Sequence, residues 1–158
     1  MTITYEGATE EVRRIVHHHA VLRRGVERRA GTVCDAAASG VPHGRQLALL
    51  REYLNAEVLP HVAAEERTLN RAAAAQAGSG ELVRELTAEH DALAYLAGRL
   101  QPSADATEAA SIAEWIATLF AGHVAKVNDR LLPALTGSGA DLTALLADMH
   151  HVQAGARV

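Results

Sequence analysis

The sequence predicts an all-α protein, an up-down-up-down four-helix bundle with a short additional C-terminal helix. Hydrophobic residues make up 49% of the 158 residues, yet aromatic residues make up only 3%. A core of Ala, Leu and Val suits closely packed helices, whereas sheets favour β-branched and aromatic side chains. Four long segments repeat apolar residues at helical spacing, and short polar connections join them. We expect one domain over residues 1–158, with the bundle at about 9–135 and the last helix at about 141–152.

The first helix is expected to run to about Ala38, where a segment rich in Gly and Pro ends it. Ile15 and Leu22 belong to its apolar stripe, and they are seven residues apart in the sequence. His19 lies between them on the same stripe. The sequence therefore predicts that a histidine of this helix points into the core.

The second helix is expected at about 45–76, with His61 and Glu65 on its inner side. These two residues are four apart, so their side chains are neighbours on one face of a helix. Pro60 lies within the helix, lacks a backbone donor and pushes against the preceding turn. We therefore expect a kink just before His61.

The third helix is expected at about 81–100 and carries His90 in its apolar stripe. The fourth is expected at about 107–135, with Trp115 and His123 among its apolar residues. The fifth helix, at about 141–152, has one apolar side, which we expect to cover an end or a groove of the bundle. Asp105, followed three residues later by Glu108, resembles a capping box at the start of the fourth helix.

Charge and cysteine content limit the possible environments of the protein. A net charge of −4 argues against a dedicated DNA-binding domain, which would usually be basic. The sequence contains no run of 18 apolar residues and no apolar N-terminal leader, so we expect no membrane association. Cys34 is the only cysteine and has no partner for an intramolecular disulfide. These features together predict a cytoplasmic protein.

One histidine from each long helix is expected on the buried side of the bundle. A single buried histidine is most often just a hydrogen-bonded core residue, but four would leave several polar rings in need of partners. A metal site would satisfy all of them, because imidazole and carboxylate groups bind iron, manganese and zinc. Each helical hairpin supplies a histidine pair, so two metal ions are plausible. The four residues are His19, His61, His90 and His123.

The order and spacing of these motifs resemble those of the hemerythrin-like, or HHE cation-binding, family from about Val12 to Leu135. The motifs are H-x-x-L at 19–22 and 90–93, H-x-x-x-E-E at 61–66 and H-x9-P at 123–133. The resemblance implies two non-haem iron ions with oxo or hydroxo bridges, carboxylate bridges and an open position for a small molecule. The ligands that it implies are His19, His61, Glu65, His90 and His123. In the first helix, His18 is the alternative to His19.

One carboxylate of the family pattern is missing. The family usually repeats H-x-x-x-E in the fourth helix, but here Val127 stands four residues after the histidine. Glu57 is one turn before His61 and could replace the missing ligand, as could Tyr53 one turn earlier, since ferric iron accepts a phenolate. The alternative for Tyr53 is an ordinary position at the edge of the core.

The predicted function is that of a non-haem di-iron protein that binds or reduces dioxygen, hydrogen peroxide or nitric oxide, in redox defence or sensing. A peroxidase-like, catalase-like or nitric-oxide-consuming activity would need an electron donor that the sequence does not identify. Reversible binding of oxygen, or storage of iron, is the alternative within the same class. From another class, a histidine phosphotransfer module would need an exposed histidine, and a partner-binding or nucleic-acid-binding helix would use a basic face. That face would be formed by Arg13, Arg14, Arg24 and Arg28.

Overall fold

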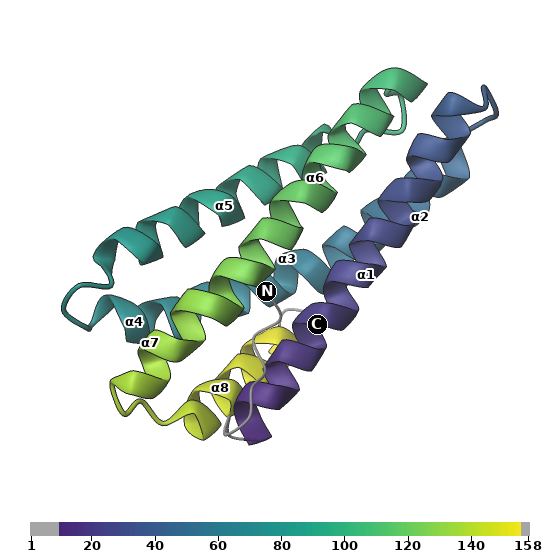
Figure 1. Cartoon of the computed structure of the whole chain (residues 1–158). Coiled ribbons are helices and arrows are strands. Elements are labelled where there is room, and N and C mark those ends of the chain that lie inside the picture. Colours follow the sequence, from purple (N-terminus) through teal and green to yellow (C-terminus); the bar gives the residue numbers. More distant parts are fainter. Residues whose placement is uncertain (1–9, 156–158) are drawn as a thin grey trace.

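A computed structural model describes residues 10–155, and the regular secondary structure within that range is entirely helical (Figure 1). This confirms the prediction of an all-α protein. Residue 9, at which the bundle was predicted to begin, lies outside the described residues. In the described part of the chain, no helix is both long enough and apolar enough to cross a membrane.

The helices form four long arms and a shorter final helix. The first and third arms are continuous α-helices, and π-helical segments interrupt the second and fourth arms. The first arm is α1 (Glu10–Ala38) and the third is α5 (Gly80–Arg99). The second arm consists of α2 (Gly44–Tyr53), η1 (Leu54–Val58), α3 (Leu59–Glu65), η2 (Glu66–Asn70) and α4 (Arg71–Ala74), where η marks π-helix. The fourth arm consists of α6 (Ala106–Lys126), η3 (Val127–Leu131) and α7 (Leu132–Gly137), and the final helix is α8 (Leu142–Gly155).

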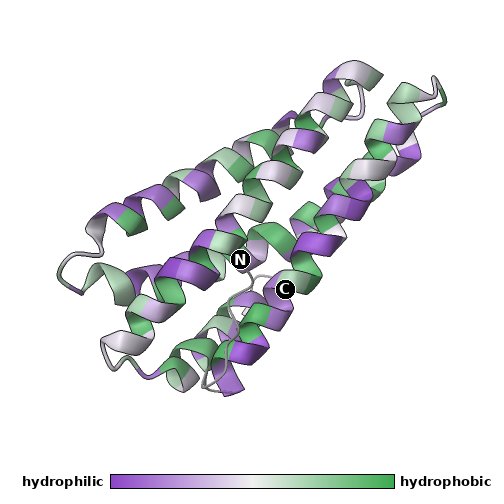
Figure 2. Cartoon of the chain, in the orientation of Figure 1, coloured by the Kyte–Doolittle hydropathy of each residue, from purple (hydrophilic) through white to green (hydrophobic). Residues whose placement is uncertain are grey.

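The arms pack side by side along their apolar faces. α1 lies against both α6 and α2, and α5 lies against α6. Figure 2 shows polar and apolar residues alternating along each arm, as amphipathic helices require. α8 packs on α1, α3 and η2, which confirms the expectation that it covers part of the bundle.

The buried apolar residues fall into two clusters, and the four histidines lie where these clusters meet. One cluster contains Leu22, Val62 and Phe120, and the other contains Ile15 and Val127. In the first and fourth arms, a histidine stands between residues of different clusters: His19 follows Ile15 and precedes Leu22, and His123 follows Phe120 and precedes Val127. The fold therefore places a polar layer between two apolar layers.

Two of the π-helical segments end directly before a Leu-Pro pair. η1 precedes Pro60 and η3 precedes Pro133. Proline removes a backbone hydrogen bond and clashes with the preceding turn, and the wider π turn accommodates both effects. A kink was predicted just before His61, and the structure has the π-helical segment η1 at this place.

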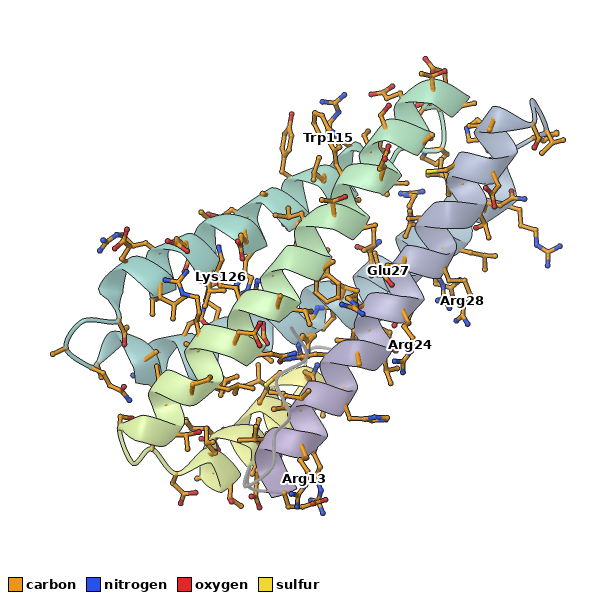
Figure 3. The ribbon with its side chains drawn as sticks, viewed as in Figure 1. Arg13, Arg24, Glu27, Arg28, Trp115 and Lys126 are labelled. Carbon is orange, nitrogen blue, oxygen red and sulfur yellow. The ribbon has the colours of Figure 1, made fainter. Side chains whose placement is uncertain are left out.

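The start of the fourth arm confirms one local prediction and corrects another. The carboxylate of Asp105 accepts a hydrogen bond from the backbone N–H of Glu108 at 2.9 Å, which caps α6. Trp115, predicted to lie in the apolar stripe, is instead 65% exposed (Figure 3). Its neighbour Ile116 takes the fully buried position, so Trp115 falls at the edge of the stripe.

Candidate metal centre

Glu65 lies at the middle of the polar layer, with histidines on both sides of its carboxylate. Its Oε1 atom is 3.0 Å from Nε2 of His19 and 3.3 Å from Nε2 of His61. On the other side, Oε2 is 3.0 Å from Nε2 of His123 and 3.7 Å from Nε2 of His90. Each carboxylate oxygen thus faces a pair of histidines, and each histidine comes from a different arm.

These five side chains form two groups of potential metal ligands that share Glu65. One group is completed by His19 and His61, the other by His90 and His123, and within each group the ligand atoms lie within 4.8 Å of one another. All five residues are buried, and Glu65 itself is 1% exposed. The structure therefore brings together the four histidines and the glutamate that the sequence singled out.

The chemistry of the donor atoms fits a metal ion in each group. Nε2 of His61 and Nε2 of His90 are buried and have no hydrogen-bond partner among the described residues. One such nitrogen belongs to each group, and both face the shared carboxylate. A buried imidazole nitrogen without a partner costs free energy, and coordination to a metal removes that cost.

Ring contacts hold the histidines in place around Glu65. The rings of His19 and His61 meet edge to face with their centroids 5.1 Å apart, and those of His90 and His123 do so at 4.8 Å. Phe120, which is fully buried, stacks on His123 at 6.1 Å. The ligand geometry is therefore fixed largely by packing before any ion binds.

Glu65 and His123 form an ion pair within the metal-free centre. Burial would raise the pKa of Glu65, but the facing imidazoles of His61 and His123 hold it well below its ordinary value. Burial would likewise lower the pKa of His123, yet its hydrogen bonds to Glu65 and Glu89 raise that pKa to about 9. Burial does lower the pKa of His61. At neutral pH, an ionised Glu65 therefore faces a protonated His123.

Every histidine of the centre has a second partner at Nδ1, on the far side of its ring. Such partners fix the orientation of a ligand ring, and a partner that accepts the proton of Nδ1 leaves Nε2 free for a metal. The contacts are His19 to Oδ1 of Asn128 at 2.6 Å, His61 to Nε2 of Gln153 at 3.2 Å, His90 to Oε2 of Glu66 at 3.2 Å and His123 to Oε2 of Glu89 at 3.1 Å.

Asn128 reaches His19 because of the π-helical segment η3. It follows His123 by five residues, which in an α-helix is about 140° around the axis at ~100° per residue. The wider π turn reduces that angle, so Asn128 lies on the inner side of the arm. Val127, at the position where a second glutamate would stand, is fully buried in an apolar cluster. The sequence analysis did not include Asn128, because a regular spacing of ~100° per residue places it away from the inner side of the helix.

Of the two remaining candidate ligands, Glu57 belongs to neither ligand group, and Tyr53 packs against one of the apolar clusters. The Tyr53 ring packs against Gly25 of α1, and the guanidinium of Arg29 lies over it at 4.0 Å. Burial raises the pKa of Tyr53, which favours the neutral phenol. Glu57 lines a surface pocket together with Tyr53 and Arg29. Tyr53 therefore occupies the alternative position considered for it, at the edge of the core.

His18, the alternative to His19, also lies outside the ligand groups, although its ring centroid is 5.0 Å from that of His61. Burial lowers the pKa of His18 to about 4, with His61 contributing to the shift, so the ring is neutral at pH 7. It lines a pocket of about 420 Å³ between α1 and α8, whose wall also contains Gln153 and Met149. Gln153 also contacts Nδ1 of His61, so this pocket reaches a side chain that lies directly behind the centre.

The helical scaffold and the buried histidine–carboxylate cluster define a metal-binding helical domain. Residues 10–135 match the model of the hemerythrin HHE cation-binding domain, and the chain belongs to that family. This confirms the resemblance seen in the sequence from about Val12 to Leu135. Among curated proteins and among solved structures, none is similar enough to this chain to count as a match.

Proposed function

We propose that this protein holds two non-haem iron ions and uses them to bind or reduce a small oxidant: dioxygen, hydrogen peroxide or nitric oxide. The observation that supports this proposal best is the shared position of Glu65, whose two oxygens each face a histidine pair. A carboxylate between two ligand groups suits a pair of ions, and helical bundles with Glu and His ligands are a known setting for di-iron centres. The proposed scaffold is the up-down-up-down bundle formed by the four arms.

The residues of the chain would supply the ligands and exclude bulk water. Four imidazoles and one shared carboxylate are few donors for two ions, which leaves positions for a small molecule. When bound in the ferrous state, the two ions would supply two electrons, which with two protons convert one hydrogen peroxide into two water molecules. The proposal places the protein in the cytoplasm, where an unidentified electron donor would restore the ferrous state.

The alternative functions have less support from the structure. A phosphotransfer histidine must be reached by a partner protein, whereas the four histidines of the centre are at most 5% exposed. The basic face of α1 is partly neutralised, because Arg13 and Arg14 both pair with Glu10. Figure 3 shows Arg24 and Arg28 pointing away from the bundle. Reversible oxygen binding is also part of the proposal: it is the function if the protein binds dioxygen without reducing it.

The experiment loads the metal-free protein with ferrous iron under anaerobic conditions and adds each oxidant in turn while recording the optical spectrum. We expect one hydrogen peroxide to oxidise two bound irons, since each ferrous ion gives one electron. Glu65→Gln should prevent the reaction by preventing iron binding, and substitution of the exposed Glu52 by Gln serves as the matched control. Bound ferrous iron that reacts with none of the three oxidants would contradict the proposal. If the spectrum of the ferrous protein returns when dioxygen is removed, the protein binds oxygen reversibly and does not reduce it.

A further inference from the structure

The four Nδ1 partners differ in charge between the two ligand groups. His19 and His61 contact the amides of Asn128 and Gln153, which are neutral. We call this group the amide-supported half.

The second ligand group has carboxylates in the same places. His90 and His123 contact Glu66 and Glu89, respectively. We call this group the carboxylate-supported half. Both halves share Glu65, so the charge of their outer partners is the chief difference between the side chains that hold them.

Glu89 is held firmly in its place behind His123. Its side chain is 17% exposed, and its Oε1 atom accepts a hydrogen bond from Nζ of Lys126 at 2.5 Å. Lys126 lies on α6, at the place labelled in Figure 3, and also pairs with Glu85 of α5 at 3.1 Å. Because this cation is shared between two carboxylates, it anchors Glu89 without cancelling the negative charge around it. Glu66 is 47% exposed and is the weaker of the two partners.

The amide-supported half must also rearrange before it can hold an ion. Gln153 presents its amide nitrogen, a donor, to Nδ1 of His61. A metal on Nε2 of His61 leaves the ring proton on Nδ1, which then needs an acceptor. The Gln153 amide must therefore turn over and present its oxygen. No such change is needed at Glu89, since a carboxylate only accepts.

A carboxylate partner makes a ligating histidine more basic and strengthens its bond to a metal, and losing such a partner typically costs 10- to 100-fold in affinity. We infer that the two halves are inequivalent: the carboxylate-supported half binds its ion first and more tightly, and the amide-supported half binds second and exchanges its ion more readily. This inference rests on the proposed two-ion centre. It assigns Glu66 and Glu89 as positioning residues, and it makes the ion nearer to the His18 pocket the labile one.

The test titrates the metal-free protein with Co²⁺ alone, measuring heat and the visible absorption of the bound ion. We expect two binding events, the first at least about 10-fold tighter than the second. His90→Ala should remove the tight event, and His61→Ala the weak one. Two events of equal affinity would overturn the inference but leave the two-ion proposal standing. Binding of a single ion, or of none, would contradict the two-ion proposal and this inference with it.

Isosteric variants test whether the charge of the outer partner is the cause. Glu89→Gln should weaken the first event by about 10-fold and leave the second unchanged. Asn128→Asp, which places a carboxylate behind His19, should strengthen the second event by a similar factor. Glu81→Gln is the matched control, because Glu81 is an exposed carboxylate on the same helix α5, and it should alter neither event. An effect of Glu89→Gln on both events equally, or on neither, would refute the inference.

Discussion

Replacement of Glu65 by glutamine changes one atom at the point where both ligand groups meet. The side chain keeps its size, but one carboxylate oxygen becomes an NH₂ group and the negative charge disappears. Because both groups use this residue, one group receives an NH₂ group that cannot bind a metal, and the other keeps a neutral carbonyl oxygen in place of a charged one. We therefore expect iron content to fall to near zero, whereas a histidine variant removes a ligand from one group only.

The same substitution should destabilise the protein in the absence of metal. The pKa of His123 is raised from 6.5 to about 9 by hydrogen bonds to Glu65 and Glu89. A shift of that size corresponds to about 3 kcal/mol of additional stability for the folded protein when His123 is protonated. Breaking a buried ion pair typically costs ~3–5 kcal/mol. We expect Glu65→Gln to lower the free energy of unfolding by about 3 kcal/mol near pH 6.

The dependence on pH has a definite sign. A histidine whose pKa is raised on folding contributes its full stabilisation below pH 6.5, and this contribution is lost as the pH rises through about 9. The difference between wild type and Glu65→Gln should therefore shrink between pH 6.5 and pH 10. Chemical denaturation of the metal-free proteins, followed by circular dichroism, measures this, with Glu52→Gln as the control. A difference that is absent at pH 6, or that grows with pH, would refute the ion pair between Glu65 and His123.

Three further substitutions test the packing around the centre. Tyr53→Phe should leave iron content and the visible spectrum unchanged, since the ring lies against Gly25 rather than at the centre; loss of a charge-transfer band would restore Tyr53 as a ligand. Gly25→Ala would make a methyl group overlap the Tyr53 hydroxyl. Overpacking costs ~1–3 kcal/mol and the better helix propensity of Ala returns ~1 kcal/mol, so thermal unfolding should show that the free energy of unfolding falls by about 1 kcal/mol. A Tyr53→Ala background should remove that loss, and its persistence there would point to another cause. Phe120→Ala should cost ~3–5 kcal/mol in denaturant titrations because the ring is fully buried, and a cost under about 1 kcal/mol would contradict its place in the core.

The arms and the five central residues could be predicted because they follow the period of the α-helix. His19 lies four residues after one buried apolar residue and three before another, so its place in the core is a local property of the sequence. The same holds for Glu65, which follows His61 by one turn. Such regular spacing is visible without any knowledge of the partners across the bundle.

The outer partners of the histidines could not be predicted in this way. Asn128 depends on a π-helical turn that shifts its angle, and a sequence read at ~100° per residue puts it on the wrong side. Glu89 precedes His90 in the sequence but contacts His123 on another arm. Gln153 belongs to α8, whose placement on the bundle is a matter of tertiary packing. These contacts form between different helices, so the spacing of residues along the sequence does not predict them.

The central claim is that four histidines and Glu65 hold two iron ions, and the most direct test is a count of metal per chain. The protein is loaded with ferrous iron, freed of excess metal and analysed by elemental analysis against quantified protein, in parallel with Glu65→Gln. The account predicts about two irons per chain in the wild type and nearly none in the variant. A wild-type value near zero, zinc in place of iron, or equal iron content in the two proteins would contradict it.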